Sequence, residues 1–153
     1  GNQFTEDLKA ALSVSFEDAE ELKRVVGVAP EGMPEGDGDQ VAARRTLTRT
    51  ADGLIEEIRG SINYYLTQAG EHNLDRLVVS GNGARLPHLA NRVARSLSTK
   101  VEPVRVLEHL GVGRIGMTES QLLDLQPVLP AAVGLAMWGK FVVPPSNRFA
   151  HVA

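Results

Sequence analysis

The sequence predicts an α/β fold in which helices come first and a strand–helix–strand–helix unit follows. Three observations carry this prediction. Apolar residues recur at steps of three and four over residues 5–26 and 40–69, as along one face of an amphipathic helix. Two short apolar runs, 74–79 and 101–106, resemble strands and flank a helical pattern. A nearly continuous apolar segment follows Pro130 and predicts a last, buried helix.

The first two helices are short. We expect Thr5, with the two acidic residues after it, to cap the first, which carries Leu8 and Leu12 on one side. Ser15 is the expected N-cap of the second, because acidic residues fill the turn that follows it. This second helix should run from residue 16 to about residue 26 and end at Gly27.

The third helix is expected to be long, from Gln40 to Ala69, after a loop over about residues 27–39 that is rich in Pro, Gly and acidic residues. Gly53 and Gly60 interrupt it and predict either close packing or a kink. Its apolar stripe consists of Leu47, Ala51, Leu54, Ile55, Ile58, Ile62, Tyr65 and Leu66.

The second half of the chain is expected to form a parallel sheet unit. Residues 74–79 predict a buried strand, residues 86–97 a helix with Pro87 in its first turn, and residues 101–106 a second strand. Thr118 predicts a capping box with Gln121 for a short helix. Two strands do not form a stable sheet alone, so we expect this chain to be part of a longer domain whose other strands precede it.

Composition narrows the range of functions. The chain has 153 residues, enough for one domain, with 42% hydrophobic and 23% charged residues, as in a typical globular protein. A net charge of −3 and few aromatic side chains argue against binding nucleic acid. No apolar run approaches the roughly 20 residues of a membrane span. The chain contains no cysteine, no P-loop motif and no pair of histidines spaced to bind a metal on one helix.

The stretch "VVSGNGARLP", residues 78–87, contains the first candidate site. Asn82-Gly83 is a favoured pair in hairpin turns, but the residues after it have a helical pattern and not that of a second strand. Alternatively, glycines between a strand and a helix expose bare backbone to a phosphate or a nucleoside, because they have no Cβ to hold a ligand away. The pattern alone leaves both interpretations open.

Glu20 and Lys23 form the second candidate site. Three residues apart on a helix, they share a face and are expected to form a surface ion pair or to bind a ligand. In the second case the carboxylate would accept hydrogen bonds from ribose hydroxyls, and the ammonium would donate to a hydroxyl or a ring nitrogen.

A third glycine motif, "GVGRIG" at residues 111–116, matches G-x-G-x-x-G. The dinucleotide-binding form of this motif requires a strand entering the first glycine and a long helix leaving the last. Neither is expected here, so this segment is interpreted as a flexible connection.

Taken in order, these segments resemble the second half of an actin-like ATPase domain, which has a ribonuclease H-like α/β fold. "GNQFTEDL" resembles the end of the second phosphate motif of that superfamily, "EDAEELK" its Ala-Glu-x-x-Lys helix, and "LVVSGNGARLPHL" its adenosine motif. Gly81 and Gly83 match the outer glycines of the adenosine motif, and Asn82 replaces the middle one. Within the superfamily, "SVSFEDAEELK", "EIRGSINYYLTQAG" and "PAAVGLAMWG" are similar to the PilM family of type IV pilus assembly.

This resemblance implies an incomplete domain, with residues 1–70 as helical subdomain IIB, 71–140 as the later half of subdomain IIA and 141–153 as a tail. It implies that ATP or ADP is bound, with Mg²⁺ held by residues that precede this chain. The expected nucleotide-binding residues are Glu20, Lys23, Gly81, Asn82, Gly83 and Arg85. Activity would be at most that of a slow ATPase, because this segment has no complete catalytic site.

The implied function is a cytoplasmic scaffold at the inner face of the cell membrane, which couples nucleotide binding to the N-terminal peptide of PilN through an N-terminal lobe outside this chain. A filament-forming relative of FtsA or MreB is the alternative, and a small-molecule kinase of the same superfamily is a third. FtsA ends in a basic membrane helix. The tail here has two prolines and only Arg148 as a basic residue after Lys140, so direct membrane insertion is not expected.

Overall fold

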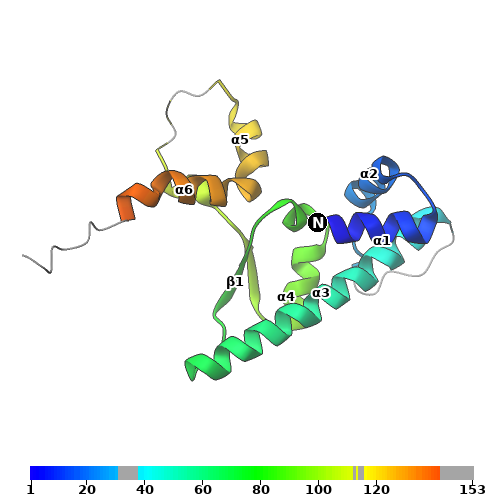
Figure 1. Cartoon of the computed structure of the whole chain (residues 1–153), viewed down its shortest axis with the longest axis horizontal. Helices are drawn as coiled ribbons and strands as arrows, with labels where there is room; N and C mark the ends of the chain where they lie inside the picture. The colour runs from blue at the N-terminus through cyan, green and yellow to red at the C-terminus, as the bar shows by residue number, and fades with distance from the viewer. Residues whose placement is uncertain (31–37, 112, 114–115, 142–153) are drawn as a thin grey trace, which may run out of the picture. The chain divides into compact units, whose positions relative to one another are not determined.

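The computed structural model describes residues 1–30, 38–111, 113 and 116–141 and divides the chain into two compact units, Gly1–Val104 and Arg105–Ala153. The first contains α1 (Asn2–Leu12), α2 (Phe16–Val26), α3 (Asp39–Ala69), β1 (Arg76–Val79), the 3₁₀ helix η1 (Asn82–Arg85), α4 (Leu89–Leu97) and β2 (Lys100–Pro103). The second contains η2 (Val106–His109), α5 (Glu119–Leu125), η3 (Gln126–Val128) and α6 (Leu129–Phe141). The described part is mostly helical, with one small parallel sheet (Figure 1).

In the first unit α1 and α2 pack on each other and on α3 (Figure 1). The predicted cap of α2 is confirmed: the Ser15 hydroxyl accepts a hydrogen bond from the Asp18 N–H at 3.1 Å. Gly27 ends α2 with a φ of 63°, also as predicted. The core of this unit is formed by buried side chains from α1 to α4, namely Phe4, Leu8, Ala19, Val26, Val28, Ala43, Leu47, Ala51, Ile55, Leu86, Leu89 and Val93.

The predicted start of α1 is wrong. The helix begins at Asn2, and Thr5 lies inside it, fully buried. Its hydroxyl is hydrogen-bonded to Glu20 and Lys23 of α2 and does not cap α1. The Thr5 hydroxyl, which the local pattern assigned to the cap of α1, is therefore used in a contact with α2.

The long third helix is confirmed almost to the residue, but its apolar stripe is buried only in its first half. Leu47, Ala51 and Ile55 are buried, whereas the side chain of Tyr65 is 59% exposed. Of the two alternatives predicted for Gly53 and Gly60, close packing is excluded, because a Cβ added at either position would meet no atom within 4 Å.

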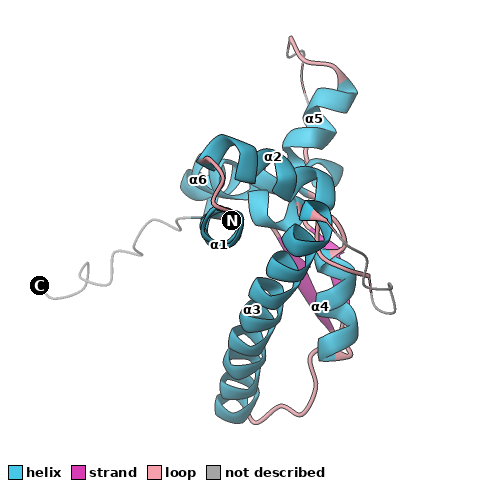
Figure 2. Cartoon of the chain, turned by 90° about the vertical axis from the view of Figure 1, so that its right-hand side faces the viewer, coloured by secondary structure: helices cyan, strands magenta, loops and turns pink. Residues whose placement is uncertain are grey.

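The two strands are paired in parallel, with Leu77 opposite Val101. A parallel pair cannot be joined by a tight turn, so the hairpin interpretation of Asn82-Gly83 is excluded. The connection passes through α4, which packs on β2 and lies beside α3 (Figure 2). Arg92 of α4 forms a two-pronged ion pair with Asp52 of α3, with N–O distances of 2.7 and 2.9 Å.

Both strands are shorter than predicted, and β1 is not buried on both faces. Leu77 packs against the core, whereas the next side chain, Val78, is 49% exposed on the other face. β2 ends at Pro103, which has no N–H to continue the ladder, although the Val104 N–H still donates to the Val79 carbonyl at 2.9 Å.

The segment after β1 also differs from the prediction. Gly81 leads into the 3₁₀ helix η1 and not directly into an α-helix. Pro87 precedes α4 and does not lie in its first turn, because His88 adopts a left-handed conformation, with φ of 66°, immediately before Leu89. The glycine turn and the α-helix are thus separated by a second bend.

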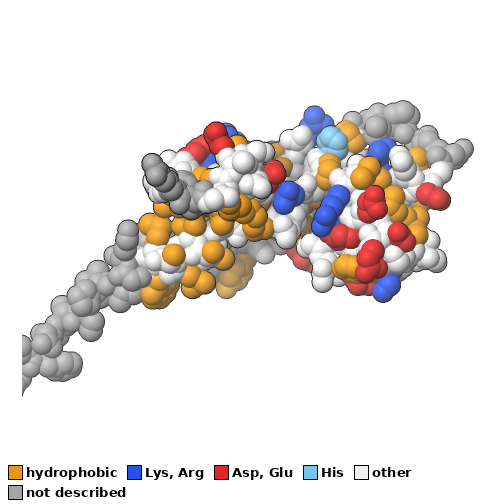
Figure 3. All heavy atoms as spheres, turned by 90° about the horizontal axis from the view of Figure 1, so that it is seen from above, with side chains coloured by type: hydrophobic (Ala, Val, Ile, Leu, Met, Phe, Trp, Pro, Cys, Tyr) orange, Lys and Arg blue, Asp and Glu red, His pale blue; other side chains and the backbone are white. Residues whose placement is uncertain are grey.

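In the second unit the capping box of Thr118 and Gln121 is confirmed. The prediction that the last helix is buried is wrong: the side chains of Leu135 and Trp138 in α6 are 74% and 68% exposed. Figure 3 shows hydrophobic side chains gathered over α6. The helix is apolar all round, and the short helices of its own unit cover only part of that surface.

The "GVGRIG" segment follows the 3₁₀ helix η2, so no strand enters its first glycine, in agreement with the prediction for the positions that the structure describes. Residues 31–37 of the predicted acidic loop and residues 142–153 of the predicted tail lie outside the described residues. Across the described ranges, no helix is both long and apolar enough to cross a membrane.

Candidate functional site

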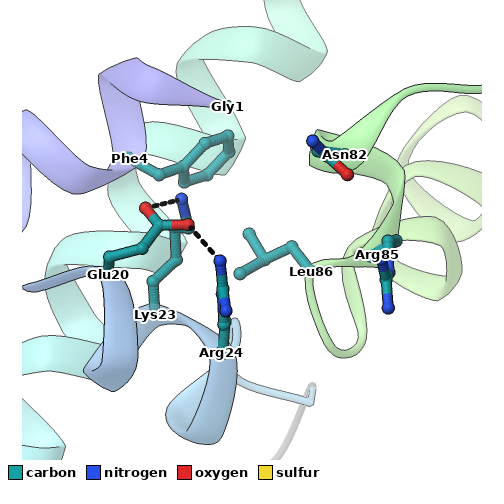
Figure 4. Close-up of a pocket in the computed structure, with 9 residues that line it drawn as sticks. Gly1, Phe4, Glu20, Lys23, Arg24, Asn82, Arg85 and Leu86 are labelled. Carbon is teal, nitrogen blue, oxygen red and sulfur yellow. Dashed lines mark hydrogen bonds and ion pairs between the residues drawn. The ribbon is translucent and has the colours of Figure 1, made fainter. Parts of the chain in front are cut away.

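One wall of the candidate site is a hydrogen-bonded cluster of three side chains from α1 and α2. The Thr5 hydroxyl donates to Glu20 Oε2 at 2.7 Å and accepts from Lys23 Nζ at 2.8 Å. Lys23 also forms an ion pair with the same Glu20 oxygen (Figure 4). The two predicted residues therefore pair with each other, and a buried hydroxyl holds both of them in position.

This cluster stabilises the charged form of Glu20. The hydrogen bond from Lys23, and then that from Thr5, lowers the pKa of the Glu20 carboxyl below its ordinary value of 4.5, against an opposing contribution from burial. Arg24 adds a further positive charge 3.4 Å from Glu20 Oε1. Glu20 is thus a carboxylate at neutral pH, with its two oxygens facing different cations.

The opposite wall is formed by η1 and the residue after it. Asn82, Gly83 and Arg85 lie on η1, and the side chain of Leu86 points into the gap between the walls (Figure 4). Gly81 is not among the lining residues. Its φ of 87° makes the turn that presents η1, so it contributes through the backbone.

Gly83 and Gly81 differ in whether the structure of the chain requires a glycine at that position. Its φ is not positive, and an added Cβ would approach only the backbone of Gly1, at 3.7 and 3.9 Å, which is ordinary van der Waals contact. Neither the backbone conformation nor packing within the chain therefore demands glycine at this position. Because Gly83 has no side chain, its bare backbone forms part of the cavity wall.

The two walls enclose a cavity of about 350 Å³, within the range of small-molecule sites. It is lined by Gly1, Phe4, Glu20, Lys23, Arg24, Asn82, Gly83, Arg85 and Leu86. The structure thus brings together five of the six predicted residues from two distant segments, with Gly81 just outside. Across the described residues, no group of three or more His, Cys, Asp or Glu is placed to hold a metal ion.

Sequence analysis missed four of the lining residues, namely Gly1, Phe4, Arg24 and Leu86. Arg24 could have been found from its spacing, because it follows Glu20 by four positions and shares its helix face. Phe4 carried no comparable signal, since it reaches the cavity only because α1 packs on α2.

Comparisons with known proteins agree with this architecture. Residues 1–140 match the family model described as type IV pilus assembly protein PilM. Among solved structures, the chain is similar to one in a "PilM-PilN type IV pilus biogenesis complex", with a TM-score of 0.69 and 27% sequence identity. The match covers 91% of this chain and 36% of that chain. No curated protein matches.

The chain is therefore a mostly helical protein with a small parallel sheet, similar in fold to a chain of a pilus biogenesis complex. Because the family model covers nearly the whole sequence, the chain belongs to the PilM family of type IV pilus assembly proteins. It spans 36% of the length of the solved PilM–PilN chain that it matches.

Proposed function

We propose that this chain forms the adenosine side of an ATP-binding cleft in a scaffold protein of type IV pilus assembly. The observation that carries the proposal is the cavity itself, in which the charged side chains of α2 face the bare backbone of Gly83. The bound nucleotide would be ATP or ADP.

The chemistry of each wall suits one part of adenosine. Glu20 is held as a carboxylate and can accept hydrogen bonds from two ribose hydroxyls, while Lys23 can donate to a hydroxyl or a ring nitrogen. The planar groups of Phe4 and Arg24 at the same cavity can contact the face of a purine. Gly83 then leaves room for the nucleoside to lie against backbone.

The proposal includes an actin-like arrangement of subdomains. Residues 1–70 would be helical subdomain IIB, residues 71–140 the later half of subdomain IIA, and residues 141–153 a tail. Phosphate-binding residues and the ligands of Mg²⁺ would then be supplied by other parts of the full-length protein. ATP would act chiefly as a conformational ligand, with hydrolysis slow at most.

PilN is the proposed partner. The similar solved chain comes from a complex named for PilM and PilN, and this chain belongs to the PilM family. We place the contact between the cytoplasmic N-terminal peptide of PilN and a lobe outside this chain. The full-length protein would then lie at the inner face of the cell membrane without inserting into it.

Nucleotide binding is tested on the full-length protein with a fluorescent ATP analogue. Lys23→Ala and Gly83→Val should each weaken binding by about 1–3 kcal/mol, the scale of a charge-assisted hydrogen bond or a steric block. Lys9→Ala is the matched control, because Lys9 forms an exposed ion pair with Glu6, at the same spacing of three, away from the cavity. Unchanged affinity in both Lys23→Ala and Gly83→Val would disprove the site assignment.

The partner is tested by co-purifying the full-length protein with a PilN N-terminal peptide, with and without ATP. We expect retention of the peptide, and a scrambled peptide of the same composition is the control. Failure to bind in both nucleotide states would contradict the pilus scaffold. Sedimentation of the protein with ATP would then distinguish it from a filament-forming actin relative, which should pellet.

A further inference from the structure

The segments that carry the two walls of the cavity are also in close contact outside it. Gly27, at the end of α2, lies against Pro87, the residue after Leu86 on the other wall. A Cβ added to Gly27 would lie 2.6 Å from the Pro87 Cβ and 2.7 Å from the Pro87 carbonyl oxygen. Real Cβ atoms do not approach other atoms so closely, so the backbones meet at this distance only because residue 27 is glycine.

Hydrogen bonds extend this contact in both directions. The buried Val28 donates its N–H to the Pro87 carbonyl at 3.1 Å. The next N–H, that of Ala29, donates to the Thr48 hydroxyl of α3 at 2.9 Å. The segment after α2 is therefore attached both to the glycine-turn wall and to the longest helix of the unit.

The contact between Gly27 and Pro87 adjoins cavity-lining residues on both walls. The Gly27 N–H donates to the Lys23 carbonyl at 3.3 Å, so Gly27 ends the helical turn that carries Lys23. Pro87 follows Leu86, whose side chain lines the cavity. A displacement of Gly27 relative to Pro87 must change the separation between α2 and η1, because a packed helix moves as a rigid element.

We propose that Gly27 and Pro87 are positioning residues that set the width of the nucleotide cleft, although neither lines it. The contact acts as a spacer: it holds α2 at the distance from η1 at which Glu20, Lys23 and Gly83 reach one nucleoside together. The functional consequence rests on the nucleotide-binding function proposed above, whereas the geometric consequence does not.

The geometric consequence is tested by measuring the distance between the walls. Because the chain contains no cysteine, Glu21→Cys on α2 and Ser80→Cys after β1, both exposed, give two specific spin-label sites for pulsed electron paramagnetic resonance. Adding Gly27→Ala should lengthen or broaden the distance distribution. Gly70→Ala is the matched control: Gly70 has a similar φ of 68°, but an added Cβ there meets no atom within 4 Å. The control should keep the wild-type distribution.

The functional consequence is read from nucleotide affinity in full-length protein without labels. Gly27→Ala should lose on the order of tenfold in affinity for a fluorescent ATP analogue, comparable to losing one charge-assisted hydrogen bond, while Gly70→Ala should lose none. An unchanged distance distribution in Gly27→Ala overturns the spacer. A changed distribution with unchanged affinity overturns its role in binding.

Two further outcomes of these experiments can be told apart from a failure of the proposal. If the wild-type protein binds no nucleotide, the proposed function fails and the distance measurement still decides the spacer. If Gly27→Ala does not fold, Pro87→Gly provides a second test, because it removes the ring and frees the backbone that Gly27 contacts. Its distance distribution should broaden, and an unchanged distribution in a folded Pro87→Gly variant overturns the proposal.

Discussion

At the scale of single residues, the cluster of Thr5, Glu20 and Lys23 shows how a surface pair becomes a prepared site. An isolated exposed ion pair three residues apart contributes little to stability and moves freely. Here Thr5 is fully buried and contacts both charged groups, so it restricts the carboxylate and the ammonium to one arrangement. A ligand that binds both groups would then find them oriented before it arrives.

This arrangement makes a prediction about pH. Replacing Thr5 by Val removes the hydroxyl but keeps the shape of the side chain, so the pKa of Glu20 should rise towards its ordinary value of 4.5. With the pKa lowered in the folded state, the stabilisation is fully present above pH 4.5 and is lost as pH falls through the folded pKa. Thr5→Val should therefore reduce the acid dependence of stability. NMR titration of the Glu20 carboxyl, with unfolding curves at several pH values, measures both effects.

Thr50→Val is the control for that experiment. The Thr50 hydroxyl donates to Asp7 at 2.5 Å, so its loss also removes a hydrogen bond between α1 and another helix, without touching Glu20. An equal change in the Glu20 pKa in both variants, or no change in Thr5→Val, would contradict the assigned cause.

At the scale of elements, local chemistry determines helix ends where no tertiary contact competes for the capping group. Ser15 caps α2 and Thr118 caps α5, both through their own side chains. Thr5 does not cap α1, because its hydroxyl is engaged by α2. The same residue type thus has a local role on the surface and a tertiary role in the core.

We predict that Ser15→Ala lowers the free energy of unfolding by about 1 kcal/mol, because the Asp18 N–H loses its acceptor at the start of α2. Ser61→Ala is the matched control. The Ser61 hydroxyl donates to the Glu57 carbonyl at an exposed position in the second half of α3, where Ala has the higher helix propensity. Urea unfolding should show a loss for the first variant and none for the second. An equal loss in both would contradict the capping role.

At the scale of the whole molecule, the two units differ in how much apolar surface they bury. The first has a continuous core, which includes the fully buried Leu8 and Leu47. In the second, α6 is the most apolar helix, yet Leu135 and Trp138 are mostly exposed. Apolar composition therefore does not measure burial in this chain.

This contrast predicts different responses to truncation. Leu47→Ala should lower the free energy of unfolding by about 2–5 kcal/mol, because it creates a cavity in the core. Trp138→Ala should cost well under about 1 kcal/mol, although it removes a larger side chain. Trp138 is the one tryptophan of the chain, so its fluorescence in the 153-residue protein should be red-shifted and quenched by acrylamide. Blue-shifted, protected emission would contradict the exposed position.

The sequence by itself determined the order and type of the main elements, the cap of α2, the extent of α3 and the helical crossover between the strands. These features depend on periodicity and on short-range chemistry, which one chain carries within a few residues. The pairing of Glu20 with Lys23 also follows from helix spacing alone. Five of the six predicted site residues line one cavity, but they were assigned from the resemblance of two motifs to a known superfamily, and they meet only because two distant segments converge.

Only the tertiary structure decided which apolar surfaces are covered, how wide the cleft is and which further residues line it. Phe4 enters the cavity because α1 packs on α2, and Gly27 meets Pro87 because two distant segments converge. The exposure of α6 was not predictable either, since burial depends on what lies opposite a side chain. All three features have the same physical reason, because each depends on a contact between segments that are distant in the sequence. A local pattern indicates which face of an element will be in contact, but it does not indicate which segment lies against that face.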